Sequence, residues 1–165
     1  MQKAPILKTS LAVLSSGLCL AANPALAQSW ETIALAKEGG IGAVSVNADS
    51  AELLVSCSED GIPAVTIGLP VMDLPDEVAP LLTIFVDGEK LRDSLGFETT
   101  PAGTGIWLNG DANAQWHNVR WLSEKIVEGE RLTVMAPSLG FATNFDLTGA
   151  REAMAEVVEA CGLRS

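Results

Sequence analysis

Short apolar runs alternate with turn residues along the first two thirds of the chain. Runs rich in β-branched and other apolar residues lie at 30–35, 44–46, 53–57, 64–69, 81–86, 90–97 and 103–108. Clusters of Asn, Asp, Ser and Gly separate them, and Asp87-Gly88 is the strongest signal for a two-residue hairpin. Strands that follow one another with a turn signal about every ten residues are typical of an antiparallel sheet, because parallel strands need helical crossovers.

Helical spacing appears only in the last third of the chain. Apolar residues predict a helix over 115–127 with Asn113 as N-cap, and a C-terminal helix that Thr148 caps and Gly162 ends. Two further strands between the helices are expected at 132–135 and 141–147. The predicted fold is therefore α+β: an antiparallel β-sheet or sandwich of about six to eight strands, with a late helix and a C-terminal helix.

The N-terminal segment has the three parts of a secretory signal peptide. Lys3 and Lys8 precede an apolar stretch, and a small-residue A-x-A motif ends at Ala27. The apolar stretch is shorter than the roughly 20 residues that span a bilayer. We expect residues 1–27 to be removed between Ala27 and Gln28, leaving residues 28–165 as a single β-rich exported domain. Its expected location is the periplasm or the extracellular space, with no transmembrane anchor after cleavage.

The charge of the chain restricts the class of partner. It has 10 basic and 21 acidic residues, and two of the basic ones leave with the signal peptide. A surface this acidic repels nucleic-acid phosphates and anionic lipid headgroups. We therefore expect no nucleic-acid partner, and a protein or envelope component that is neutral or basic.

Cysteine usage agrees with export. Cys19 lies in the signal peptide, so only Cys57 and Cys161 remain, and in an oxidising compartment they have one possible intramolecular pairing. The sequence predicts a disulfide between them. A nucleophilic cysteine working with His117 is the alternative, and no CxxC spacing points to a redox enzyme.

The C-terminal third resembles a known group of small exported proteins. The run Val127-Glu128-Gly129-Glu130-Arg131-Leu132-Thr133-Val134 is followed by Phe145-Asp146-Leu147-Thr148-Gly149 and an alanine-rich closing helix. This order is similar to the invasion-associated locus B proteins and to the TagO-like accessory proteins of type VI secretion. The TagO-like pattern also has a strand ending in Cys and a last helix ending in Cys. The resemblance covers residues 50–162 loosely and 115–162 better, and it implies a non-enzymatic β-rich envelope protein.

Catalytic and metal-binding signatures are not found in the sequence. His117 is the only histidine, there is no G-x-S-x-G or S-x-x-K motif, and the residues for a zinc site are lacking. The stretch 109–113 has the oxygen spacing of a calcium loop but Ala114 stands in place of its glycine, so a turn and a helix cap are the preferred interpretation. We therefore predict no catalytic residues, no metal site and no cofactor.

Tryptophans mark the segment where a partner is expected to bind, if a partner-binding segment exists. The candidate residues are Trp107, Asn109, Trp116 and Trp121. Trp116 and Trp121 lie about 140° apart on a regular helix, so both cannot face one core and one of them should be partly exposed. In the alternative interpretation all three tryptophans belong to the core.

These observations favour a non-enzymatic periplasmic or secreted accessory protein. It would bind another protein or a cell-envelope component, with a link to secretion or host interaction. One alternative is an inhibitor of an envelope hydrolase that inserts the proline-rich loop at 70–80. The other is an envelope hydrolase that uses a pair of carboxylates. A deep pocket with two facing carboxylates would favour the enzyme, and a flat apolar patch would favour binding.

Overall fold

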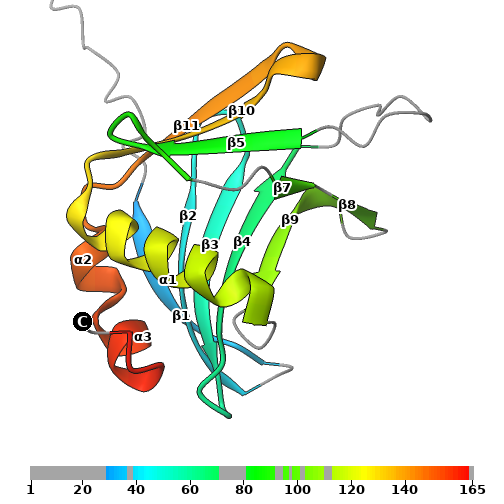
Figure 1. Ribbon diagram of the computed structural model, residues 1–165. Coiled ribbons are helices and arrows are strands. Elements are labelled where there is room, and N and C mark those ends of the chain that lie inside the picture. Colours follow the sequence, from blue (N-terminus) through cyan, green and yellow to red (C-terminus); the bar gives the residue numbers. More distant parts are fainter. Residues whose placement is uncertain are drawn as a thin grey trace, which may run out of the picture.

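Antiparallel strands make up most of the chain and form two sheets (Figure 1). This computed structural model describes residues 29–36, 39–70, 81–91, 95–96, 98–100, 103–109 and 113–163, and among these the side chains of 95–109 and 113–114 are not described. The predicted signal peptide, its cleavage site and the loop at 70–80 beyond residue 70 lie outside the described residues, as do positions 110–112.

The larger sheet, here called the large sheet, has the strand order β1-β2-β3-β4-β9-β8. Its strands are β1 (Trp30–Ala34), β2 (Gly40–Val46), β3 (Glu52–Ser58), β4 (Pro63–Leu69), β8 (Glu98–Thr100) and β9 (Gly103–Asn109). The other sheet, the small sheet, has the order β11-β10-β5-β6, and β7 also pairs with β5. It consists of β5 (Leu81–Val86), β6 (Glu89–Lys90), β7 (Leu95–Gly96), β10 (Arg131–Ala136) and β11 (Phe141–Asp146).

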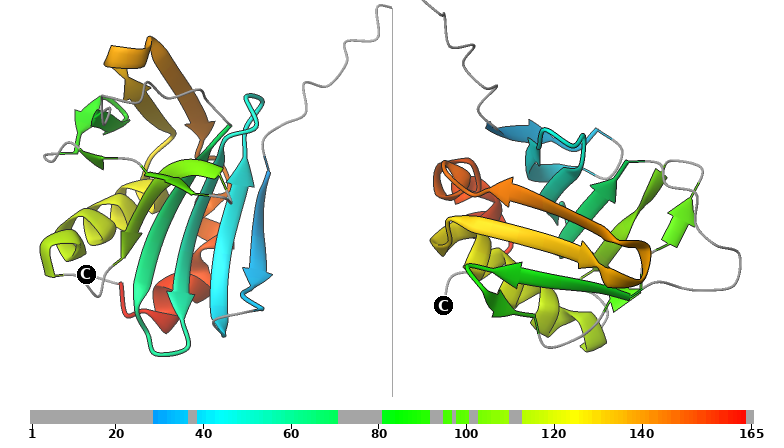
Figure 2. Two further views of the ribbon diagram at one scale, coloured as in Figure 1. Left: turned by 90° about the vertical axis from the view of Figure 1, so that its right-hand side faces the viewer. Right: turned by 90° about the horizontal axis from the view of Figure 1, so that it is seen from above.

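The helices lie on one side of the large sheet. The long helix α1 (Asn113–Glu128) lies against β4 and β9, and a short 3-10 turn, η1 (Pro137–Leu139), joins β10 to β11. Two short helices, α2 (Ala150–Ala153) and α3 (Ala155–Ala160), end the domain against β1, β2 and β3. The strands of the small sheet cross above α1, so sheet and helices together cover the inner face of the large sheet (Figures 1 and 2).

Period-two alternation places the core between these layers. Leu53, Val55 and Cys57 of β3 are fully buried, whereas the residues between them are half-buried on the other face. The small sheet and the helices supply the opposite wall of the core, with Leu82, Ile84, Leu132, Val134, Phe145, Val119, Leu122, Ile126, Met154 and Val157. The α+β fold with antiparallel sheets, a late helix and a C-terminal helix is confirmed. Among the described residues, eight strands have five or more residues, and β6, β7 and β8 are short additions.

Local details follow the predicted turn chemistry with two exceptions. Asp87 and Gly88 both have positive φ, of 49° and 83°, as the tight hairpin between β5 and β6 requires. The return strand expected at 90–97 is divided into β6 and β7. The N-cap assigned to Thr148 is wrong: its backbone N–H donates to Asp146 Oδ1, and Gly149, in a left-handed conformation, precedes α2.

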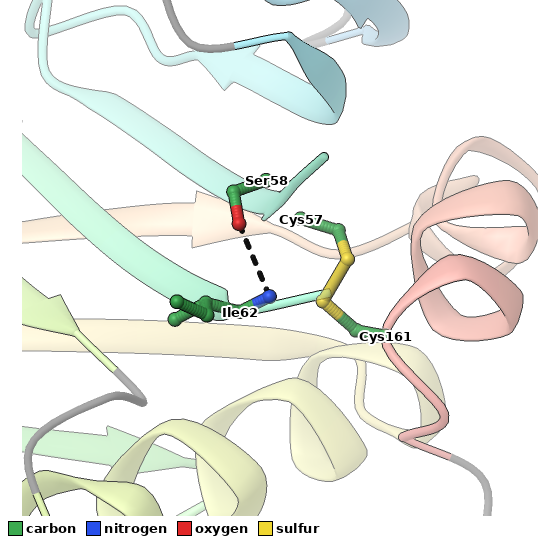
Figure 3. Close-up of a disulfide and its surroundings, with 4 residues drawn as sticks. All are labelled: Cys57, Ser58, Ile62 and Cys161. Atoms are coloured by element: carbon green, nitrogen blue, oxygen red, sulfur yellow. Dashed lines mark hydrogen bonds between the residues drawn. A yellow bond between two sulfur atoms is a disulfide. The ribbon is translucent and has the colours of Figure 1, made fainter. Parts of the chain in front are cut away.

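The predicted disulfide is present and holds the last helix on the large sheet (Figure 3). Cys57 lies on the inner face of β3, and Cys161 directly follows α3. Their Cα atoms are 5.7 Å apart, and their sequence separation is 104 positions. Beside it, the backbone N–H of Ile62 donates to Ser58 Oγ at 3.1 Å and fixes the β3–β4 turn. Because α3 has only six residues, its stability depends on this attachment and on buried Val157. None of the described helices is both long enough and apolar enough to span a membrane.

Removing the disulfide should loosen the C-terminal helices before the sheets. For the double variant Cys57→Ala/Cys161→Ala, we expect the free energy of unfolding in urea to fall by about 2–4 kcal/mol. Hydrogen exchange should accelerate most in residues 155–161, because the chain loses its only covalent link between α3 and β3. Equal acceleration in β10 and β11 would contradict this assignment.

Candidate functional site

A polar groove lies on the outer face of the small sheet, where the β2–β3 turn meets the edge strand β11. It has a volume of about 1070 Å³. Four segments that are distant in sequence line it: the β2–β3 turn, the β5–β6 turn, the residues entering β10, and the end of β11 with the residues after it. Thr133 and Asn144, which face each other across β10 and β11, form its floor, and Thr133 Oγ1 donates to Asn144 Oδ1 at 2.6 Å.

Asn47 fixes the wall that the β2–β3 turn provides. Its Oδ1 accepts hydrogen bonds from the backbone N–H groups of Asp49 and Ala51, both at 3.0 Å. Its Nδ2 donates to Thr143 Oγ1 at 2.7 Å and to the carbonyl oxygen of Asn144 at 2.8 Å. The buried amide thereby uses both donors and both acceptor positions. It closes its own turn and attaches that turn to the free edge of β11.

Asp49 is oriented through the same network. Thr143, which is only 1% exposed, donates its hydroxyl proton to Asp49 Oδ2 at 2.7 Å. The hydroxyl therefore accepts from Asn47 and donates to Asp49. As a result, an exposed carboxylate in the groove is held by a buried support, which reduces the conformational freedom that it would lose on binding a ligand.

The carboxylate of Asp87 has a structural role on the opposite wall. Its oxygens accept hydrogen bonds from the backbone N–H groups of Glu130 and Arg131, at 2.9 to 3.2 Å. Gly129 packs against this turn so closely that a Cβ there would lie 2.9 Å from Asp87 Oδ2 and 2.7 Å from Val86 Cγ1. These contacts attach the β5–β6 hairpin to the loop between α1 and β10 and place Glu130 and Arg131 at the groove.

Asp146 completes the acidic lining. Hydrogen bonds from the Thr148 side chain and backbone lower the pKa of its carboxyl group, and the nearby charge of Arg131 acts in the same direction. The carbonyl oxygen of Asp146 accepts a hydrogen bond from Trp30 Nε1 at 3.2 Å, so β1 also contacts this end of β11. These hydrogen bonds therefore favour the ionised form of the Asp146 carboxyl group.

The groove therefore attracts cations. Its lining includes the carboxylates of Asp49, Asp87, Glu130 and Asp146 and one guanidinium, that of Arg131. A general acid needs a raised pKa, but the pKa of Asp146 is lowered, and Asp87 is occupied by backbone amides. Within the described part of the chain, no group of three or more His, Cys, Asp or Glu side chains could hold a metal ion.

The candidate partner-binding segment, which was selected for its tryptophans, is in another part of the fold. Trp107 and Asn109 are in β9, where their backbones pair with Thr66 and Ala64 of β4; their side chains are outside the description. Trp116 and Trp121 are both half-buried on α1. His117 is exposed on the same helix. The described side chains of Trp116, His117 and Trp121 do not line the groove.

Trp121 contributes to the contact between α1 and the β5–β6 hairpin. It packs against the core, and Lys125 Nζ lies 6.0 Å from the centroid of its ring. The same ammonium group forms a 2.6 Å ion pair with Glu89 of β6. This hydrogen bond lowers the pKa of Glu89 and raises that of Lys125. The structure thus gives Trp121 a packing role, whether or not a partner also contacts it.

The sequence pattern predicts the turn at 47–51, but it does not predict the groove. Asn, Asp and Ser at 47–50 indicated side-chain bonding within the turn, as Asn47 shows. Pairing of β10 between β5 and β11 brings Asp87, Glu130 and Asp146 together, and no local pattern reveals which strands are neighbours. No protein-family model matches the chain, and neither a curated protein nor a solved structure is significantly similar to it.

Replacing the buried amide should cost much more stability than replacing an exposed one. We expect Asn47→Ala to lower the free energy of unfolding by about 2–3 kcal/mol, because Thr143 and the turn amides lose their partners. The matched variant Asn144→Ala removes an exposed amide from the same groove and should cost less than about 1 kcal/mol. Urea denaturation of both variants tests this, and equal losses would show that Asn47 does not join the two sheets.

Acid should weaken the domain partly through Asp146. Its pKa is lower in the folded than in the unfolded state, so its stabilising contribution is present at neutral pH and is lost as the pH falls through the folded pKa. Asp146→Asn should therefore lose less stability than the wild type between about pH 5 and pH 2. Glu156→Gln, at an exposed position of α3, serves as control and should leave the wild-type slope unchanged. Parallel pH profiles for wild type and Asp146→Asn would contradict the assignment.

Proposed function

We propose that this protein is an exported, non-enzymatic accessory protein that binds a basic segment of a partner in the acidic groove. The partner is another protein or a component of the cell envelope. Export is supported by the signal-peptide pattern of residues 1–27 and by a disulfide, which is rare in reducing compartments. The resemblance to TagO-like and locus B proteins suggests that the binding serves secretion or host interaction.

The observation that carries the proposal is the supported acidic lining of the groove. Asp49 is oriented through Thr143 and Asn47, and Glu130 is positioned by Asp87 on the other wall. A Lys or Arg side chain between these walls would meet carboxylates that need little reordering. The large excess of acidic residues in the chain would also accelerate the approach of a basic partner.

A carboxylate-dependent hydrolase is less well supported by the same geometry. Such an enzyme needs one protonated and one ionised carboxyl group on either side of the bond to be cleaved. In the groove, the pKa of Asp146 is lowered by its hydrogen bonds from Thr148, and the oxygens of Asp87 accept hydrogen bonds from the backbone of Glu130 and Arg131. The inhibitor alternative depends on residues 71–80, which lie outside the described part of the chain.

The groove can be tested with a hydrophilic basic peptide in which lysine and arginine alternate with glycine. In a titration followed by NMR, we expect amide shifts around Asp49 and Glu130. The double variant Asp49→Asn/Glu130→Gln should weaken binding about threefold to tenfold, because two exposed charge interactions are lost while the amide oxygen introduced at position 49 can still accept the Thr143 hydrogen bond. Binding should also weaken as salt increases.

The control variant Glu128→Gln/Glu156→Gln removes the same charge at exposed helix positions outside the groove. It should bind the peptide as tightly as the wild type does. Equal weakening by both double variants would mean that net charge alone attracts the peptide, and the groove would then not be the binding site.

A further inference from the structure

The outer face of the large sheet is left uncovered by the described elements. The left view of Figure 2 faces this side of β1–β4, and α1, α2 and α3 do not lie over it. An apolar face of a sheet is normally covered by a helix or a second sheet, whereas a polar face can stay in contact with water. The composition of this face is therefore informative.

Its surface over β1, β2 and β3 is apolar. Ile33, Leu35 and Leu54 converge on Gly42, where an added Cβ would lie 2.9 Å from Leu54 Cδ1 and 3.4 Å from each of the other two side chains. Val44 lies opposite Leu54 in the register, and Val46 is 52% exposed. We call these residues the outer patch: Ile33, Leu35, Val44, Val46 and Leu54.

The rim of the outer patch is acidic. Glu31 lies opposite Val44 on β1, and Glu52 lies opposite Val46 on β3. Among the described residues 29–36 and 39–70 there is no Lys or Arg. The basic residues that the structure describes lie in the small sheet and the helices, at Lys90, Arg120, Lys125, Arg131 and Arg151.

We propose that the outer patch is a docking site for an amphipathic helix of a partner protein that has Lys or Arg beside its apolar stripe. Three strands spaced about 4.8 Å apart give an apolar strip about 10 Å wide, which is the diameter of one helix. Glu31 and Glu52 would pair with basic residues that border the stripe of such a helix. A second copy of the chain would instead bring these carboxylates against each other, so self-association through this face is disfavoured.

This docking site goes beyond the proposed function, because it is a different surface from the groove. The probe is a synthetic helical peptide of leucine and lysine, about 15 residues long. In an NMR titration of the protein with its disulfide intact, we expect the amides of Ile33, Val44 and Val46 to shift. Val46→Ser should weaken binding about fivefold through the loss of apolar contact.

Charge reversal separates specific docking from general attraction. Glu31→Lys/Glu52→Lys should weaken binding about tenfold, whereas Glu128→Lys/Glu156→Lys, with the same change in net charge, should have little effect. The groove variant Asp49→Asn/Glu130→Gln should leave binding of this peptide unchanged, so failure of one site is distinguishable from failure of the other. The proposal is overturned if the shifts fall in the groove, if both charge reversals weaken binding equally, or if a leucine–glutamate peptide binds as well.

Discussion

The arrangement of the two sheets depends on the side-chain amide of Asn47. A strand at the edge of a sheet has backbone carbonyls that need partners, and β11 is such a strand. Asn47 supplies a donor to the carbonyl of Asn144, and Trp30 of β1 supplies one to the carbonyl of Asp146. These two side chains therefore donate hydrogen bonds to backbone carbonyls of β11, in the place where a further strand would otherwise do so. The same contacts define the groove, since they hold the β2–β3 turn at the edge of β11.

The C-terminal helices close the domain by a different means. Both α2 and α3 are too short to be stable alone, and they are held by buried Met154 and Val157, by the disulfide to β3, and by the hydrogen bond from Thr32 Oγ1 to the carbonyl of Ala153. This last bond, like that of Trp30, begins in β1. The first strand is thus connected both to the small sheet and to the closing helices.

The sequence predicted where the strands and helices lie along the chain better than which strands lie next to each other in a sheet. Alternation and turn residues located β3, β4, β5 and β11, and helical spacing located α1, because these signals are local. The pairing of Cys57 with Cys161 followed from there being one possible partner. The cap at Thr148 failed because its hydroxyl group bonds to Asp146 and Gly149, in a left-handed conformation, precedes α2. The groove was not predicted, since it depends on β10 lying between β5 and β11. The outer patch was also missed: Val44 and Leu54 alternate with buried residues, and a strand pattern cannot show that the second face lacks a cover.

The two surfaces differ in how they could bind a partner. In the groove, polar contacts dominate, so affinity would be modest and sensitive to salt, and the supported carboxylates would mainly fix the orientation of the partner. On the outer patch, apolar area would provide most of the binding energy, and Glu31 and Glu52 would select among apolar partners by charge. Both surfaces repel anionic partners. In both proposals the carboxylates would select basic partners, and the outer patch would add apolar contact to that selection.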